Sequence, residues 1–193
     1  MESKELLNDY VFMGYDVRQT NNNRIKWINK NRIISVDKVI CPRLNAIKDF
    51  DWEKVGTKLT EWGMCLSYQV AYEYYKYIPN KEYFEILAFF LSCSDFENGK
   101  SKGILVDSNA LKLNDEIGKL KKFEGFDIGT IEYEWISYLT NCGRENEVSI
   151  KTKVNNVNLL SDYGNALKIK KLAEKDIPEH QPWAIWSVWS TYS

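Results

Sequence analysis

The chain has 193 residues, of which 44% are hydrophobic and 14% are aromatic. This is too much apolar area for a disordered chain, and it is enough for one core, so we expect a single domain over residues 1–193. The formal net charge of -1, from 26 basic and 27 acidic residues, excludes a global field that would steer the chain onto nucleic acid or an anionic membrane. The longest apolar run, Ile86–Leu91, is too short to cross a bilayer, and the N-terminus has no apolar stretch. We therefore expect a cytoplasmic protein.

The first forty residues have the composition of β-strands. Residues 10–17 and 33–36 are rich in strand formers, and the polar stretch between them contains an Asn-rich turn. This order predicts a hairpin near the N-terminus, which Pro42 closes.

A change of period follows, because apolar residues now recur at steps of three and four. They are Trp52, Val55, Leu59, Trp62, Leu66, Val70, Tyr74 and Tyr77. This spacing predicts one long amphipathic helix over residues 51–77. Asp49 or Asp51 is a suitable N-cap, and Pro79 ends the helix.

The middle of the chain is harder to interpret. Residues 81–93 are apolar nearly all round, so the pattern does not separate a buried helix from a central strand; we favour a helix after Asn80. Residues 104–106 predict a short strand, and residues 114–123 and 131–139 predict helices, the second ended by Gly143.

The C-terminal region gives clearer signals. Ser161 or Asp162 can cap a helix that runs through Ala173 and is broken by Pro178. Residues 183–189 are rich in strand formers and predict a final buried strand. Taken together, the elements predict an α+β fold in which the long amphipathic helix and further helices pack on a mainly antiparallel sheet.

One tetrapeptide appears once in each half of the chain. Gly14-Tyr15-Asp16-Val17 recurs as Gly125-Phe126-Asp127-Ile128. Two matches of this length do not make a repeat protein.

Residues 94–101 match a phosphate-binding loop except that Ser94 stands where the first glycine belongs. Such a loop leads into a helix whose amides hold phosphate, whereas a strand is predicted here after Gly103, so we expect a polar hairpin turn. The four cysteines, Cys41, Cys65, Cys93 and Cys142, form no close pair, and His180 is the only histidine. We expect free thiols, no metal and no cofactor.

Two further interpretations stay open. An enzyme could use scattered carboxylates such as Asp16 and Asp127, or a pair formed by Cys142 and His180. A nucleic-acid-associated regulator would use the lysine groups at residues 119–122 and 168–171, although we expect no direct nucleic-acid partner because nearby glutamates balance them.

A resemblance to a known class rests on three short patches, residues 125–128, 139–143 and 178–183. There the chain resembles the immunity proteins of bacterial polymorphic toxin systems. The resemblance covers under a quarter of the chain, and it implies a bacterial, cytoplasmic α+β protein that binds one cognate protein toxin and blocks its active site without chemistry of its own. The class has no shared catalytic motif, so no site residue is transferred from it.

We therefore predict a toxin inhibitor that acts by protein–protein contact and is not an enzyme. Many toxins are basic enzymes that act on nucleic acid, and opposite charge speeds their capture. Acidic residues near aromatic residues are the resulting candidates for partner binding: Asp49, Asp51, Trp52, Asp95 and Glu97.

Overall fold

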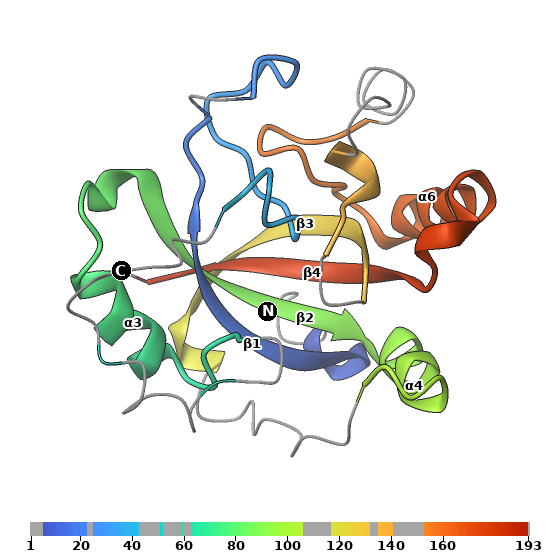
Figure 1. Ribbon diagram of the computed structural model, residues 1–193, viewed down its shortest axis with the longest axis horizontal. Helices are drawn as coiled ribbons and strands as arrows, with labels where there is room; N and C mark the ends of the chain where they lie inside the picture. Colours follow the sequence, from blue (N-terminus) through green and yellow to red (C-terminus); the bar gives the residue numbers. More distant parts are fainter. Residues whose placement is uncertain are drawn as a thin grey trace.

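In the part of the chain that the structure describes, the fold is built on one antiparallel sheet of four strands in the order β1-β2-β4-β3 (Figure 1). The strands are β1 (Tyr10–Gln19), β2 (Phe84–Ser92), β3 (Leu120–Thr130) and β4 (Trp183–Thr191). The computed structural model describes residues 6–22, 25–42, 51, 59, 63–105, 117–131, 135–140 and 153–192. The α+β class and the antiparallel sheet predicted from the sequence are confirmed.

Each face of the sheet is covered by a different set of segments. The helices α3 (Tyr68–Lys76) and α6 (Tyr163–Asp176) bury apolar residues against one face, where they meet strand residues such as Ile86 and Ile185. The other face carries Leu87 and Trp186 and is covered by the segments around residues 34–36, 135 and 157–159. Burial on both faces explains why β2 and β4 are apolar almost without interruption.

The second half of the chain repeats the order of elements in the first. Among the described elements, a short 3₁₀ helix precedes the strand in each half, at Leu6–Asp9 and Ile117–Lys119, and an α-helix, a 3₁₀ helix and a second strand follow. The second half has a further 3₁₀ helix, Tyr138–Thr140, between β3 and α6. The later 3₁₀ helices are Lys81–Tyr83 and Pro178–His180. The helix α4 (Cys93–Ser101) follows the first of these two halves.

The pairing register is repeated as well. Gly14 pairs with Phe89 and Asp16 with Leu87, while Gly125 pairs with Val188 and Asp127 with Trp186. In both halves the register shifts immediately before the glycine. The two strand pairs are therefore related by a pseudo-two-fold axis between β2 and β4.

The repeated glycine has a physical reason. Gly14 and Gly125 have φ values of +133° and +143°, which L side chains rarely adopt. An added Cβ at Gly14 would lie 2.7 Å from the Cβ of Met64, and one at Gly125 would lie 2.7 Å from the Cβ of Leu159. The recurring tetrapeptide thus marks a structural repeat, which two short sequence matches alone did not indicate.

Contacts around the repeated strands correspond too. Tyr15 forms a bridge with Cys65, and Phe126 forms the equivalent bridge with Leu160. The next helix is then capped by Ser67 in α3 and by Asp162 in α6. In each half the first helical tyrosine packs edge-on against the bridged aromatic residue, with centroids 5.9 Å apart for both Tyr68–Tyr15 and Tyr163–Phe126.

The long helix predicted over residues 51–77 is shorter in the structure. Cys65 forms bridges with both Tyr15 and Leu59, so the chain is extended here and α3 begins only at Tyr68. Residues 52–58 and 60–62 lie outside the described residues. Val70 and Tyr74 are buried as predicted, whereas Tyr77 is exposed.

Several predictions for the middle of the chain were wrong, because pairing with distant strands determines the structure there. Residues 84–92 form the central strand β2, and residues 120–123 begin β3, where helices were predicted. The segment 94–101 lies in α4 and is not a hairpin turn. Residues 33–36 form no strand, and the predicted hairpin is reduced to one bridge between Asn21 and Arg32.

Two other segments fall partly outside the described residues. In the predicted helix over 131–139, the described part contains a bridge at Ser137 and the start of a 3₁₀ helix, Tyr138–Thr140. Residues 104–105 are not a strand, and Val106 and Gly143 are not described. The predictions of a first strand from Tyr10, a helix capped by Asp162 and a final strand from Trp183 are confirmed.

Candidate partner-binding site

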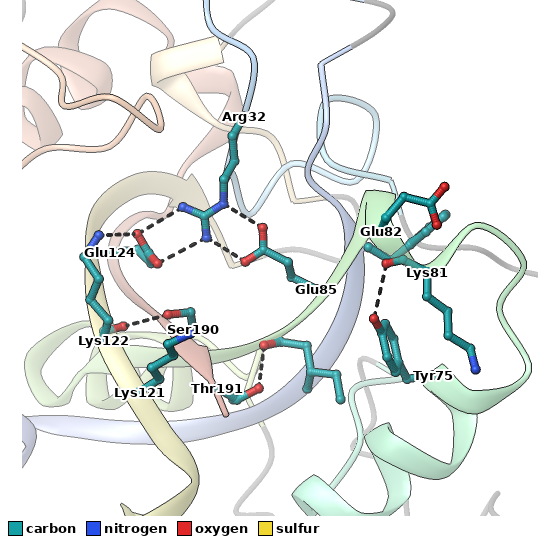
Figure 2. A pocket seen from close by; sticks show the side chains of 12 residues that line it. Arg32, Tyr75, Lys81, Glu82, Glu85, Lys121, Lys122, Glu124, Ser190 and Thr191 are labelled. Atoms are coloured by element: carbon teal, nitrogen blue, oxygen red, sulfur yellow. Dashed lines mark hydrogen bonds and ion pairs between the residues drawn. The ribbon is translucent and has the colours of Figure 1, made fainter. Parts of the chain in front are cut away.

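A cavity of about 430 Å³ opens at the end of the sheet where β2 and β3 begin and β4 ends (Figure 2). We call it the sheet-end pocket. Its walls come from all three strands, from α3 and from the segment before β2. Its lining includes Arg32, Tyr75, Lys81, Glu85, Lys121 and Glu124.

Arg32 joins two strands across this pocket. Its Nε and Nη2 atoms donate to the two carboxylate oxygens of Glu85, both at 2.6 Å. Its Nη1 and Nη2 atoms also donate to Glu124, at 3.2 and 3.1 Å (Figure 2). A planar guanidinium suits such two-sided pairing, so Arg32 holds one wall of the pocket in a defined geometry.

The ionisation of these groups is set by the pairing. Burial alone disfavours the charged guanidinium, but hydrogen bonds from Arg32 to Glu85 and Glu124 outweigh it and raise the pKa of Arg32. Burial also opposes the charge of Glu124, but the hydrogen bonds and charge of Arg32 dominate, and the pKa of Glu124 is lowered. The pairing therefore favours the charged forms of Arg32 and Glu124 at neutral pH.

Three tyrosines, Tyr68, Tyr72 and Tyr75, lie along one side of α3 and pack against the core, and we call them the tyrosine stripe. Neighbouring rings are stacked, with centroids 5.9 Å apart for Tyr68–Tyr72 and 6.5 Å apart for Tyr72–Tyr75. All three are half-buried. Because Tyr75 also lines the pocket, the stripe and the pocket form one continuous surface.

Each ring of the stripe has a lysine ammonium group over it. Lys119 lies 5.5 Å from the centroid of Tyr68, Lys76 lies 5.8 Å from Tyr72, and Lys81 lies 6.0 Å from Tyr75. Such cation–π contacts orient the rings. Tyrosines that are already ordered lose little conformational entropy when a partner binds, which suits them for an interface.

The structure describes three of the five residues predicted to bind a partner, namely Asp51, Asp95 and Glu97. Glu97 is exposed on α4, 3.8 Å from Lys100 across an ion pair, and Asp51 is exposed. Asp49 and Trp52 lie outside the described residues. Asp95 is only 2% exposed, and it accepts hydrogen bonds from Ser92 and from the backbone N–H of Ile185.

Asp16, one of the carboxylates considered for an enzyme, has a structural role in this fold. It pairs with Arg18 at 2.8 Å, and neither side chain is more than 1% exposed. Arg18 also donates to the backbone oxygens of Cys41 and Val36, at 2.7 and 3.3 Å. The pair therefore ties β1 to the segment that covers this face.

Asp127 ties the same segment to β3. It accepts four hydrogen bonds, from the backbone of Ile128 and Val36 and from the hydroxyls of Ser35 and Ser137, at 2.5 to 2.8 Å. Burial raises its pKa, and these donors reduce that rise. Its oxygens are occupied by the fold.

The Cys/His alternative finds no pair in the described part of the chain. Cys142 lies outside the described residues, and His180 packs edge-on against Trp183 at 6.5 Å. Cys41, Cys65 and Cys93 are free thiols. Within the described ranges, no three His, Cys, Asp or Glu residues are grouped as metal ligands, and no helix is long and apolar enough to cross a membrane.

Sequence reasoning missed the residues that build this site. Arg32, Glu85 and Glu124 are far apart in the chain and meet only through the strand order. The tyrosine stripe had a visible signal, because positions 68, 72 and 75 are spaced for one face of a helix. The prediction of that helix uses only its buried face.

Comparisons with protein-family models, with curated proteins and with solved structures find no match for this chain. The resemblance to immunity proteins therefore stays a prediction.

Proposed function

We propose that this protein is a binding protein of the immunity type, which neutralises a cognate bacterial toxin by direct contact. The tyrosine stripe, continuous with the sheet-end pocket, is the observation that carries this proposal. Ordered, half-buried aromatic rings beside a polar cavity have the composition of an interface centre with a polar rim. The proposed contact surface therefore consists of the tyrosine stripe and the sheet-end pocket, in place of the acidic residues predicted from the sequence.

The use of the buried carboxylates supports binding over catalysis. Asp16 neutralises a buried arginine, and Asp127 is saturated by four donors. A general acid or base needs an oxygen within reach of substrate. Neither carboxylate offers one while the covering segment is in place.

The test is co-expression with the product of the adjacent open reading frame. We expect co-purification as a one-to-one complex and rescue of growth when that product is toxic. Absence of a complex together with undiminished toxicity would remove the proposal.

The repeat supplies a matched control for the surface. Tyr72 lies five residues after the cap Ser67, and Leu167 lies five after the cap Asp162. We expect Tyr72→Ala to weaken binding by about 2 kcal/mol, in the range of interface tyrosines, and Leu167→Ala to leave it unchanged. Equal effects of the two substitutions would place the interface elsewhere.

A further inference from the structure

The internal repeat gives each wall of the sheet-end pocket a counterpart at the other end of the sheet. The strand register relates Ile86 to Ile185 and Thr191 to Ser92. Tyr75 corresponds to Lys170, because each lies eight residues after its helix cap, Ser67 or Asp162. The two ends can therefore be compared position by position.

A carboxylate occupies the counterpart position. Asp95 accepts hydrogen bonds from the hydroxyl of Ser92 and from the backbone N–H of Ile185, both at 2.8 Å. It also pairs with the ammonium group of Lys170. These partners of Asp95 are the equivalents of Thr191, Ile86 and Tyr75, all of which line the sheet-end pocket.

The charges around the pocket also favour a carboxylate. Arg32 and Lys122 balance Glu85 and Glu124, and Lys76 pairs with Glu73. The remaining charged groups of the pocket and stripe are Lys81, Lys119, Lys121 and Glu82, which leaves an excess of two positive charges. Among the described residues, no carboxylate lies within ion-pair distance of Lys81, Lys119 or Lys121.

We propose that the sheet-end pocket receives a carboxylate side chain from an acidic segment of the partner protein, in the position that Asp95 occupies at the other end. Lys81 and Lys121 supply the positive charge that Lys170 supplies there. The tyrosine stripe packs against the rest of the segment. This inference rests on the proposed function in taking the partner to be a protein.

A peptide probe tests the inference without the natural partner. The purified full chain is titrated at low salt with a short blocked peptide of alternating Glu and Tyr, and backbone amide shifts are followed by NMR. We expect shifts in residues 72–76, 81–86 and 119–124. No binding, equal binding of a peptide with Lys in place of Glu, or tighter binding of single-stranded oligothymidylate would overturn the inference.

Charge-reversal variants give a second test of the inference. We expect the double variant Lys81→Glu, Lys121→Glu to bind the acidic peptide about tenfold more weakly, with a flatter salt dependence. Lys168→Glu with Lys171→Glu on α6 is the matched control and should bind like the parent protein. All four side chains are exposed, so both variants should fold. Equal binding by the two double variants, or tighter binding by the first, would contradict the inference.

The two proposals fail in different ways. If the acidic peptide binds but the adjacent gene product forms no complex, the proposed function fails and the pocket's preference stands. If the complex forms but is unaffected by Lys81→Glu and Lys121→Glu, the toxin-binding function stands and the acidic-segment inference is wrong.

Discussion

Replacing Asp16 by Asn should be among the most destabilising single changes in this protein. The Arg18 side chain is fully buried, and its Nε atom donates to Asp16 at 2.8 Å. Asparagine keeps the size of the side chain but leaves the guanidinium as a buried charge without this counter-ion. Breaking a buried ion pair from one side costs about 3–5 kcal/mol, which is a large share of the total stability of a domain of this size.

Asp127→Asn is the matched control, because the repeat places Asp127 at the position equivalent to Asp16. Its carboxylate faces four neutral donors, so the substitution strands no cation. The side-chain oxygen of the asparagine can accept the hydrogen bonds of the two donors on one side. Its side-chain nitrogen then faces the N–H of Val36 and cannot accept a hydrogen bond from it. Leaving that group unsatisfied costs about 1–3 kcal/mol.

Urea unfolding followed by tryptophan fluorescence measures both variants against the parent protein. We expect the midpoint of Asp16→Asn to fall further than that of Asp127→Asn, with unchanged slopes. If Asp16→Asn cost no more than Asp127→Asn, the reasoning that Arg18 depends on this counter-ion would be refuted.

Three other predictions use single features of the fold. Burial raises the pKa of Asp127 above its ordinary 3.8, so the folded state holds this proton more tightly than the unfolded state. The stabilisation from the protonated side chain is full below pH 3.8 and is lost as pH rises through the pKa of the folded state. In a pH series of urea midpoints, Asp127→Asn should remove this pH dependence, and a variant that keeps the pH dependence of the parent protein would contradict the prediction. Gly14→Ala should cost about 2 kcal/mol or more through strain and overlap, whereas Gly118→Ala, with no atom within 4 Å of the added Cβ, should change the urea midpoint little; similar losses would contradict the strain. Burial raises the pKa of Cys41 to about 11, so iodoacetamide at mildly alkaline pH should label exposed Cys93 well before Cys41, as read by peptide mass spectrometry; equal rates would contradict the buried position.

Elements with local signals could be predicted from the sequence. The helix α6 has a capping aspartate, Asp162, and a proline after its end, and β4 has strand formers without a breaker. Both signals act within a few residues, so no knowledge of the partner segments was needed.

Elements decided by long-range pairing could not be predicted in this way. The run in β2 is apolar on both faces because the strand is central, and this removes the alternation that would separate it from a helix. The extended chain before α3 is held by Cys65 pairing with Tyr15. The candidate site has the same origin, since Arg32 meets Glu85 and Glu124 only once the sheet is assembled.

The repeat was visible in the sequence only as one tetrapeptide. Its glycine and aspartate occur in both halves and have the same roles there, the glycine at a positive φ and the aspartate as acceptor for the following N–H. The helices differ, since α3 has Tyr72 and Tyr75 where α6 has Leu167 and Lys170. That difference is what distinguishes the candidate binding surface from the other half.

Hydrogen–deuterium exchange of the free protein and of its complex with the adjacent gene product tests the central claim most directly. The account predicts slowed exchange in residues 72–86 and 119–124, with α6 unchanged. Slowed exchange confined to α6 or to α4, with the tyrosine stripe and the sheet-end pocket unchanged, would contradict it.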